Sequence, residues 1–196
     1  MEKRLILTSR GLNTGMGTDL IGRELLKYGD LSSKKIYLFC DPHVSIESIV
    51  IESCISIGFK EENIFLSTSC ENDAILDMDY IYITEGNTFS ILSILKERGI
   101  DKVIKQAYMN GTTVIGASAG AMITGKSIEE AYSYDRNEVH LKDYSSLALF
   151  DGIVLPHYTK KEMRKYIKNS PGLENRYKML LSVANDEILV LEMNDD

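Results

Sequence analysis

The chain has 196 residues, of which 44% are hydrophobic and 26% are charged, and its formal net charge is −7. Such a length and composition are typical of a globular protein with a full hydrophobic core, so we expect residues 1–196 to form one domain. The negative charge and the lack of a basic stripe argue against nucleic acid as a main partner, because phosphate binding needs clustered basic residues.

The sequence also indicates where in the cell the protein is expected and whether its cysteines form disulfides or a zinc site. The first apolar run, at residues 5–7, is too short for a signal-peptide core, and no other run approaches a membrane span. We therefore expect a cytoplasmic protein without a membrane partner. The cysteines, Cys40, Cys54 and Cys70, are odd in number and lack C-x-x-C spacing, so they indicate neither a disulfide framework nor a zinc site.

Short apolar runs alternate with helical patterns along the chain. The predicted strands cover residues 5–8, 35–40, 63–66, 80–84, 112–115, 152–155 and 187–191. The predicted helices cover residues 18–28, 45–57, 87–97, 101–109, 160–168 and 173–181. Residues 129–149 are mixed and polar, and we expect a loop there with short irregular structure.

This alternation predicts an α/β fold, with a mainly parallel sheet and helices on both faces. Ligands bind such sheets beyond the carboxyl ends of the strands. Four candidate residues follow predicted strands at that edge: His43, Gly86, Ser118 and His157. We expect a single site there.

The stretch from Gly116 to Gly120 reads Gly-Ala-Ser-Ala-Gly, between a β-branched run and a segment of small residues. This is G-x-S-x-G in a strand-to-helix context, the pattern of a nucleophile elbow. The two glycines would let strand and helix pass closely, and the turn would lift the Ser118 hydroxyl clear of the sheet. The N–H of Ala119 would then point toward a developing oxyanion. The plainer alternative is a tight turn in which Ser118 only caps the helix.

A serine nucleophile needs a base within hydrogen-bond reach, and histidine is the usual one. His140 lies in a polar region and is expected to be solvated. His43 and His157 both follow apolar runs, so position alone does not separate them. Either could instead be a structural histidine bonded to a neighbouring carbonyl.

The base needs an acceptor that orients it. Asp135 precedes His157 and gives the chain order Ser, Asp, His. Asp186 and Glu187, before the last predicted strand, are alternatives, and Asn185 is a neutral one. Simple surface solvation is the alternative explanation for all the acidic candidates.

A second oxyanion donor is expected from a neighbouring strand end. Gly86, in the stretch Thr84-Glu85-Gly86-Asn87-Thr88-Phe89, would let the backbone come close to a ligand. Asn87 or Thr88 could equally cap the following helix, and both roles are compatible.

Three blocks of the sequence together resemble the peptidase E (dipeptidase E-like) serine peptidases of family S51. They are Glu85-Gly86-Asn87-Thr88-Phe89, Gly116-Ala117-Ser118-Ala119-Gly120-Ala121 and Leu155-Pro156-His157-Tyr158. Their order and spacing match over nearly the whole chain. The resemblance implies a flavodoxin-like fold similar to class I glutamine amidotransferases, with serine in place of their cysteine. It also implies that Ser118 is the nucleophile and that His157, rather than His43, is the base.

The chain departs from the family at Glu85, where the family usually has the first glycine of Gly-Gly-Asn-Thr-Phe. A carboxylate at this position could bind the free amino group of a substrate. For the third member of the triad, Asp135 matches a family position and is our first choice. An acid near the final strand is the family alternative, and there our alignment puts Asn185, with Asp186 one residue on.

The resemblance thus implies a serine peptidase acting on short peptides, with Asp-X dipeptides and an aspartate-based polymer as known substrates of the family. An acidic substrate side chain would need a cation such as Arg136 or Lys126, and Asn87 could also contact substrate. We expect no metal or cofactor and a monomer or homodimer. The competing hypotheses are a non-catalytic small-molecule or peptide-binding protein on the same fold, and a small esterase.

Overall fold

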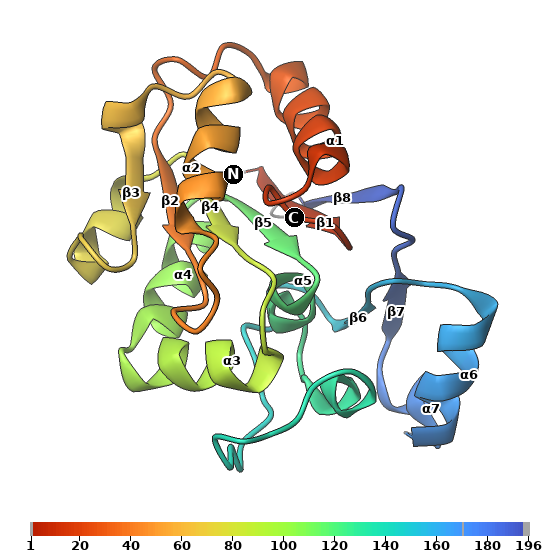
Figure 1. The fold of residues 1–196 in the computed structure, drawn as a ribbon. Coiled ribbons are helices and arrows are strands. Elements are labelled where there is room, and N and C mark those ends of the chain that lie inside the picture. The colour runs from red at the N-terminus through yellow and green to blue at the C-terminus, as the bar shows by residue number, and fades with distance from the viewer. Residues whose placement is uncertain (1, 170, 194–196) are drawn as a thin grey trace.

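A six-stranded sheet forms the centre of the molecule, with its strands in the order β3-β2-β4-β5-β1-β8 (Figure 1). The computed structural model describes residues 2–169 and 171–193. The strands of this sheet are β1 (Lys3–Thr8), β2 (Ile36–Phe39), β3 (Ile64–Leu66), β4 (Tyr80–Ile83), β5 (Thr113–Ala117) and β8 (Ile188–Met193). The pairs among β1 to β5 are parallel, and β8 runs antiparallel to β1. The predicted mainly parallel α/β fold is confirmed.

Helices cover both faces of the sheet (Figure 1). They are α1 (Gly15–Leu25), α2 (Glu47–Ser56), α3 (Thr88–Glu97), α4 (Ile100–Met109), α5 (Ala119–Thr124), α6 (Lys160–Asn169) and α7 (Leu173–Arg176). Short 3₁₀ helices occur at η1 (Leu26–Tyr28), η2 (Glu61–Asn63), η3 (Asn72–Asp77) and η4 (Glu129–Ser133). Among the described residues, no helix has the length and apolarity needed to cross a bilayer.

The core is divided between the two faces because successive side chains of a strand point to opposite sides. On β1, Leu5 and Leu7 face the cluster beneath α3, α4 and α5, whereas Ile6 faces the cluster beneath α1 and α2. All four residues of β2 and all four of β4 are buried. Burial on both faces explains why these strands appear in the sequence as nearly continuous apolar runs.

The register of the strands brings the site residues to one edge. Thr8 pairs with Ala117, Phe39 with Ile83, and Ile83 with Gly116. The loops that follow β1, β2, β4 and β5 therefore start side by side at the carboxyl edge of the sheet. This is the edge where ligands of parallel α/β sheets bind.

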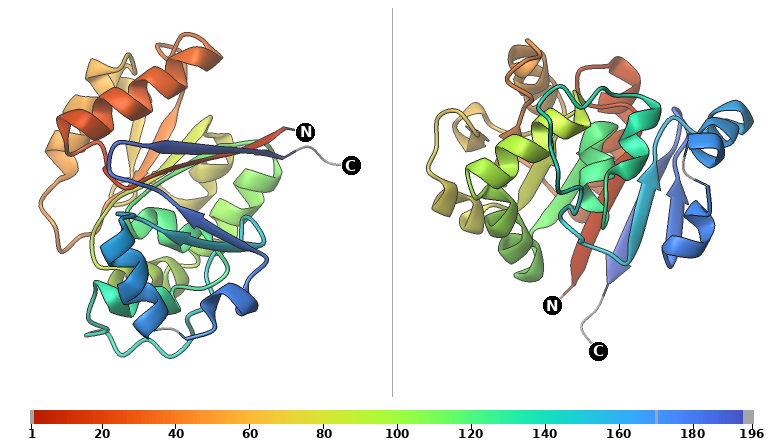
Figure 2. Two further views of the ribbon diagram at one scale, coloured as in Figure 1. Left: turned by 90° about the vertical axis from the view of Figure 1, so that its right-hand side faces the viewer. Right: turned by 90° about the horizontal axis from the view of Figure 1, so that it is seen from below.

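A second, two-stranded sheet stands beside β8, together with α6 and α7 (Figures 1 and 2). It consists of β6 (Gly152–Leu155) and β7 (Met179–Ser182), which run parallel. His157 therefore follows a strand of this smaller sheet, and the expectation that all four candidates follow strands of one sheet is wrong for that residue.

The predicted helix at residues 173–181 is also wrong beyond Arg176. Leu180 packs with the small cluster around Tyr166, whereas Met179 and Leu181 pack against the main core. This alternation has the period of two that a strand requires, and pairing with β6 satisfies the backbone. The apolar run is too short for helical and strand periodicity to be separated from sequence.

Candidate active site

Ser118 occupies a strained turn between β5 and α5. Its φ and ψ are 51° and −108°, values that cost a non-glycine residue about 1–3 kcal/mol. The turn is held by two hydrogen bonds, from the Ser118 N–H to the Thr8 carbonyl at 2.9 Å and from the Gly120 N–H to the Thr84 carbonyl at 3.1 Å. Because these hydrogen bonds join the turn to the ends of both neighbouring strands, the backbone that carries the Ser118 hydroxyl is held in place at the sheet edge.

The two glycines of the G-x-S-x-G pattern are required by close packing. A Cβ atom on Gly116 would lie 2.7 Å from the Gly120 carbonyl oxygen and 2.8 Å from the Ala121 Cα. A Cβ atom on Gly120 would collide with the backbone of Ile83 and lie 3.0 Å from the Thr84 carbonyl oxygen. The strand and the helix can therefore pass each other only without these side chains, as the pattern predicts.

Ser118, His157 and Asn185 form a hydrogen-bonded row. The Ser118 Oγ lies 2.8 Å from His157 Nε2, and His157 Nδ1 lies 2.7 Å from Asn185 Oδ1. An amide oxygen only accepts, so the neutral imidazole carries its proton on Nδ1. His157 Nε2 is then free to accept the Ser118 hydroxyl proton, which is the relationship between a serine nucleophile and its general base.

His157 is positioned by a residue that the sequence analysis did not single out. The His157 N–H donates to Ser9 Oγ at 2.8 Å, and the Ser9 hydroxyl donates to the Val183 carbonyl at 2.7 Å. Ser9 is buried directly after β1, so it links the main sheet to the loop that carries the imidazole. Its place after a predicted strand at the carboxyl edge was the only signal in the sequence. The backbone of His157 is also strained, with a φ of 57°.

The Asp135 carboxylate is hydrogen-bonded to Thr88, and Asn185 takes the place beside His157 Nδ1 that our first choice gave to Asp135. The Asp135 Oδ2 accepts from the Thr88 N–H at 2.8 Å and from the Thr88 hydroxyl at 2.6 Å. The first N–H groups of a helix have no partner within the helix, and a carboxylate satisfies them well. Asp135 therefore caps α3. Its neighbour Tyr134 instead packs on His157, with ring centroids 6.0 Å apart.

The remaining candidates for the base and its acceptor lie elsewhere. His43 and His140 are exposed, as is Asp186. Glu187 accepts from the Ala184 N–H at 3.0 Å, which closes the turn that precedes β8. Asn185 alone of the candidates near the last strand meets the imidazole.

Gly86 lies in the loop between β4 and α3, next to the serine turn. Its φ of 152° suits glycine, and the loop continues into Asn87, the N-cap of α3. The Asn87 Oδ1 accepts from the N–H groups of Phe89 and Ser90, both at 3.1 Å, and Asn87 Nδ2 donates to the Arg136 carbonyl at 3.0 Å. The Asn87 side chain is thus engaged in capping and in holding the loop that carries Arg136.

The carboxyl group of Glu85 points into the loop between β1 and α1. Tyr82 donates to Glu85 Oε2 at 3.3 Å, and a Cβ atom on Gly11 would collide with the same oxygen. Burial raises the pKa of the Glu85 carboxyl above its usual value. In this conformation Glu85 links two loops of the edge, and it fills the space that Gly11 leaves open.

The two candidate cations differ in their partners. Lys126 forms an ion pair with Asp151. The Arg136 side chain is exposed and forms no ion pair with any other residue that the structure describes, while its carbonyl accepts a hydrogen bond from Asn87 at the edge of the site. Arg136 is therefore the better placed of the two to meet an acidic ligand.

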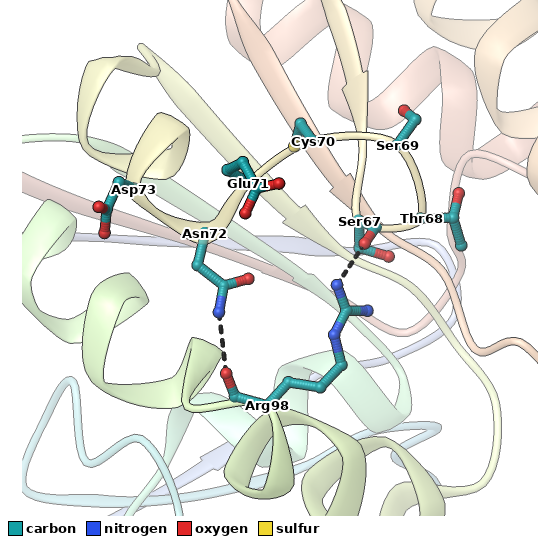
Figure 3. Close-up of a pocket in the computed structure, with 8 residues that line it drawn as sticks. All are labelled: Ser67, Thr68, Ser69, Cys70, Glu71, Asn72, Asp73 and Arg98. Atoms are coloured by element: carbon teal, nitrogen blue, oxygen red, sulfur yellow. Dashed lines mark hydrogen bonds between the residues drawn. The ribbon is translucent and has the colours of Figure 1, made fainter.

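A polar cavity of about 580 Å³ lies away from this row, between Arg98 and the loop after β3 (Figure 3). The Arg98 Nη2 donates to the Ser67 carbonyl at 2.6 Å, and Asn72 Nδ2 donates to the Arg98 carbonyl at 2.8 Å. Because β2 and β4 separate β3 from β5, this cavity is not part of the Ser118 site. Within the described ranges, no three His, Cys, Asp or Glu side chains converge as a metal site would require.

The chain is similar to known peptidases in both sequence and fold. The model of the family described as "Peptidase family S51" matches residues 52–195. An uncharacterised peptidase of Listeria monocytogenes is 35% identical over 115 residues, which cover 56% of this chain and 56% of that protein. Peptidase E of Haemophilus influenzae is 32% identical over 111 residues, which cover 57% and 49% of the two chains. The chain matches about half the length of these curated relatives.

Solved structures show the same fold. A candidate peptidase E from Listeria monocytogenes superposes with a TM-score of 0.74 at 23% identity, and the match covers 100% of both chains. A peptidase from an acI-B1 Actinobacterium gives a TM-score of 0.72 at 16% identity, covering 97% of this chain and 84% of that one.

Proposed function

The chain belongs to peptidase family S51, and we propose that it is a serine peptidase that hydrolyses short peptides through an acyl-enzyme on Ser118. One observation carries the proposal: the Ser118 Oγ lies 2.8 Å from His157 Nε2, while the opposite ring nitrogen is held by Asn185. In this proposal the strained turn at Ser118 is a nucleophile elbow.

The proposed reaction starts when His157 Nε2 takes the Ser118 hydroxyl proton as the oxygen attacks the scissile carbonyl. The N–H groups of Ala119 and Gly86 would donate to the oxyanion of the tetrahedral intermediate, and each such donor is worth about 10²–10³ in rate. His157 would then protonate the leaving amine, and water would hydrolyse the acyl-enzyme. Asn185 would hold the imidazole in the required orientation throughout.

For the substrate we propose a peptide with an acidic residue before the cleaved bond, of which Asp-X dipeptides are the simplest. The support is the exposed guanidinium of Arg136, whose main chain is bonded to Asn87 beside Gly86. A bidentate arginine contact suits a carboxylate well. The competing cation, Lys126, is already paired with Asp151.

The test is hydrolysis of X-Leu dipeptides, with X as Asp, Glu, Asn, Ala, Leu and Lys, by the wild type and by Ser118→Ala. We expect selective cleavage of Asp-Leu, a loss of at least about 10³-fold in Ser118→Ala, and an unchanged melting temperature. Retained hydrolysis in Ser118→Ala would refute the mechanism. Cleavage of other peptides in place of Asp-Leu would refute only the substrate class.

Two matched variants test the cation. Arg136→Ala should raise KM for Asp-Leu about tenfold with little change in kcat, since the lost contact exists before and during the reaction. Lys126→Ala should behave as the wild type. If no peptide is cut, a fluorophosphonate probe distinguishes an active serine from an inert one, and an unlabelled Ser118 would favour a non-catalytic binding protein.

A further inference from the structure

We infer that Asp41 is a positioning residue that fixes the backbone of the Gly86 loop, and thereby the direction of the Gly86 N–H. The inference rests on the proposed function, in which that N–H is an oxyanion donor. Asp41 lies two residues after β2 and is 1% exposed. It is therefore too deeply buried to bind substrate itself.

Both carboxylate oxygens of Asp41 accept from main-chain groups. Oδ2 accepts from the Asn87 N–H at 3.0 Å and Oδ1 accepts from the His43 N–H at 2.9 Å. The Asp41 N–H in turn donates to Thr84 Oγ1 at 3.2 Å. The end of β2 is thus tied on both sides of Gly86, to Thr84 before it and to Asn87 after it.

Steric contact acts on the same loop. A Cβ atom on Gly86 would lie 2.5 Å from Asp41 Oδ2 and 2.7 Å from Asp41 Cβ. The main chain of Gly86 therefore rests directly on the aspartate. Glycine is the residue with the most backbone freedom. Here the peptide group between Gly86 and Asn87 is held by its hydrogen bond to Asp41, and the Asp41 side chain blocks rotation of the Gly86 backbone. The neighbouring N–H of Gly86 is consequently fixed in direction.

The charge of Asp41 cannot itself favour the reaction. A carboxylate close to a developing oxyanion repels it, so a purely electrostatic role predicts faster acylation when the charge is removed. A positioning role predicts the opposite. In Asp41→Asn the side chain keeps one acceptor oxygen and turns an NH₂ group toward either His43 or Asn87, so one of the two hydrogen bonds is lost.

The experiment compares wild type, Asp41→Asn and the control Asp79→Asn in the full chain. Asp79 accepts from the Lys35 N–H at 2.9 Å before β4, at the opposite edge of the sheet. The readouts are the second-order rate of Ser118 labelling by a fluorophosphonate, kcat and KM for Asp-Leu, and the melting temperature. For Asp41→Asn we expect labelling and kcat to fall about 10- to 100-fold with KM within about twofold of wild type. Asp79→Asn should keep wild-type rates.

Thr84→Val provides a second variant in case Asp41→Asn does not fold. It removes the acceptor of the Asp41 N–H while keeping the shape of the side chain, and we expect a smaller fall in the labelling rate. Wild-type or faster labelling in a folded Asp41→Asn, or unchanged labelling in Thr84→Val where Asp41→Asn is unfolded, overturns the inference. If the wild type itself is not labelled at Ser118, the proposed function fails and the inference fails with it. Labelling of the wild type with unaffected variants overturns the inference alone.

Discussion

The Nδ1 atom of His157 lies 2.7 Å from the Oδ1 atom of Asn185. A neutral amide therefore takes the position that a carboxylate has in a Ser-His-Asp triad. An amide oxygen orients the imidazole and selects its tautomer, but it supplies no negative charge to stabilise the imidazolium formed during attack. Cys-His-Asn sites on other folds work with the same arrangement.

Asn185→Ala should lower kcat about 10²-fold for any peptide that the enzyme cleaves, because the imidazole loses the contact that fixes its orientation. The exposed neighbour gives a matched control, and Asp186→Ala should leave kcat unchanged. Asp135→Asn should weaken the cap of α3 by about 1 kcal/mol and affect kcat less than Asn185→Ala does. A larger loss of kcat in Asp135→Asn than in Asn185→Ala would contradict this assignment.

Asn185→Asp should convert the row into one with a charged acceptor. A carboxylate beside the imidazole favours its protonated form, and the base must be neutral to accept the serine proton. The acid limb of the kcat/KM profile should therefore move to higher pH. Rate profiles between pH 5 and pH 9 for both proteins measure this shift, and superimposable acid limbs would show that the side chain at 185 does not face the base.

Gly120→Ala should destabilise the fold by about 2 kcal/mol, because the added methyl group would overlap the backbone of Ile83. Gly15→Ala is the matched control. Gly15 begins α1 with no atom within 4 Å of the added methyl, so alanine should be neutral or stabilising by up to about 1 kcal/mol. Urea unfolding of both variants measures the difference. Equal stabilities would mean that α5 can move away from β4.

The parts of the site that were predictable depend on local chemistry. Gly116 and Gly120 predict a tight strand-to-helix turn because they have no side chains. In the structure, neighbouring backbone atoms leave no room for a Cβ atom at either position. The strands β2 and β4 were predictable because they are buried on both faces.

The parts that were missed or left open depend on distant contacts, and the sequence offers Asn185 only as one of several alternatives. Asn185 meets His157 only because β7 pairs with β6 and turns the chain back beside the imidazole, and residues 173–181 gave no decisive period for that strand. Asp135 has the chain order expected of a triad member, yet its carboxylate accepts from the Thr88 N–H, which has no partner within α3. In the sequence Asp41 marks only a strand end, because its partners Thr84 and Asn87 lie more than forty residues away.

A buried carboxyl group should make the stability of the fold depend on pH. Glu130, in η4, is 1% exposed, and among the described residues neither of its carboxylate oxygens has a hydrogen-bond partner. Burial raises its pKa to about 7, with the nearby Glu129 acting in the same direction, while Arg176 at 3.9 Å acts against it.

Because the folded state holds this proton more tightly than the unfolded state, the folded protein binds more protons between about pH 4.5 and pH 7. The free energy of unfolding should therefore fall by up to about 3 kcal/mol as the pH rises through that window. Glu130→Gln should remove this dependence and be more stable than wild type at pH 8. Glu129→Gln, at the partly exposed neighbour that pairs with Arg176, should keep most of the wild-type slope, because burial of Glu130 is the main cause of its raised pKa. Urea unfolding at pH 5 and pH 8 measures both effects, and equal slopes for wild type and Glu130→Gln would show that the carboxyl is hydrated in solution.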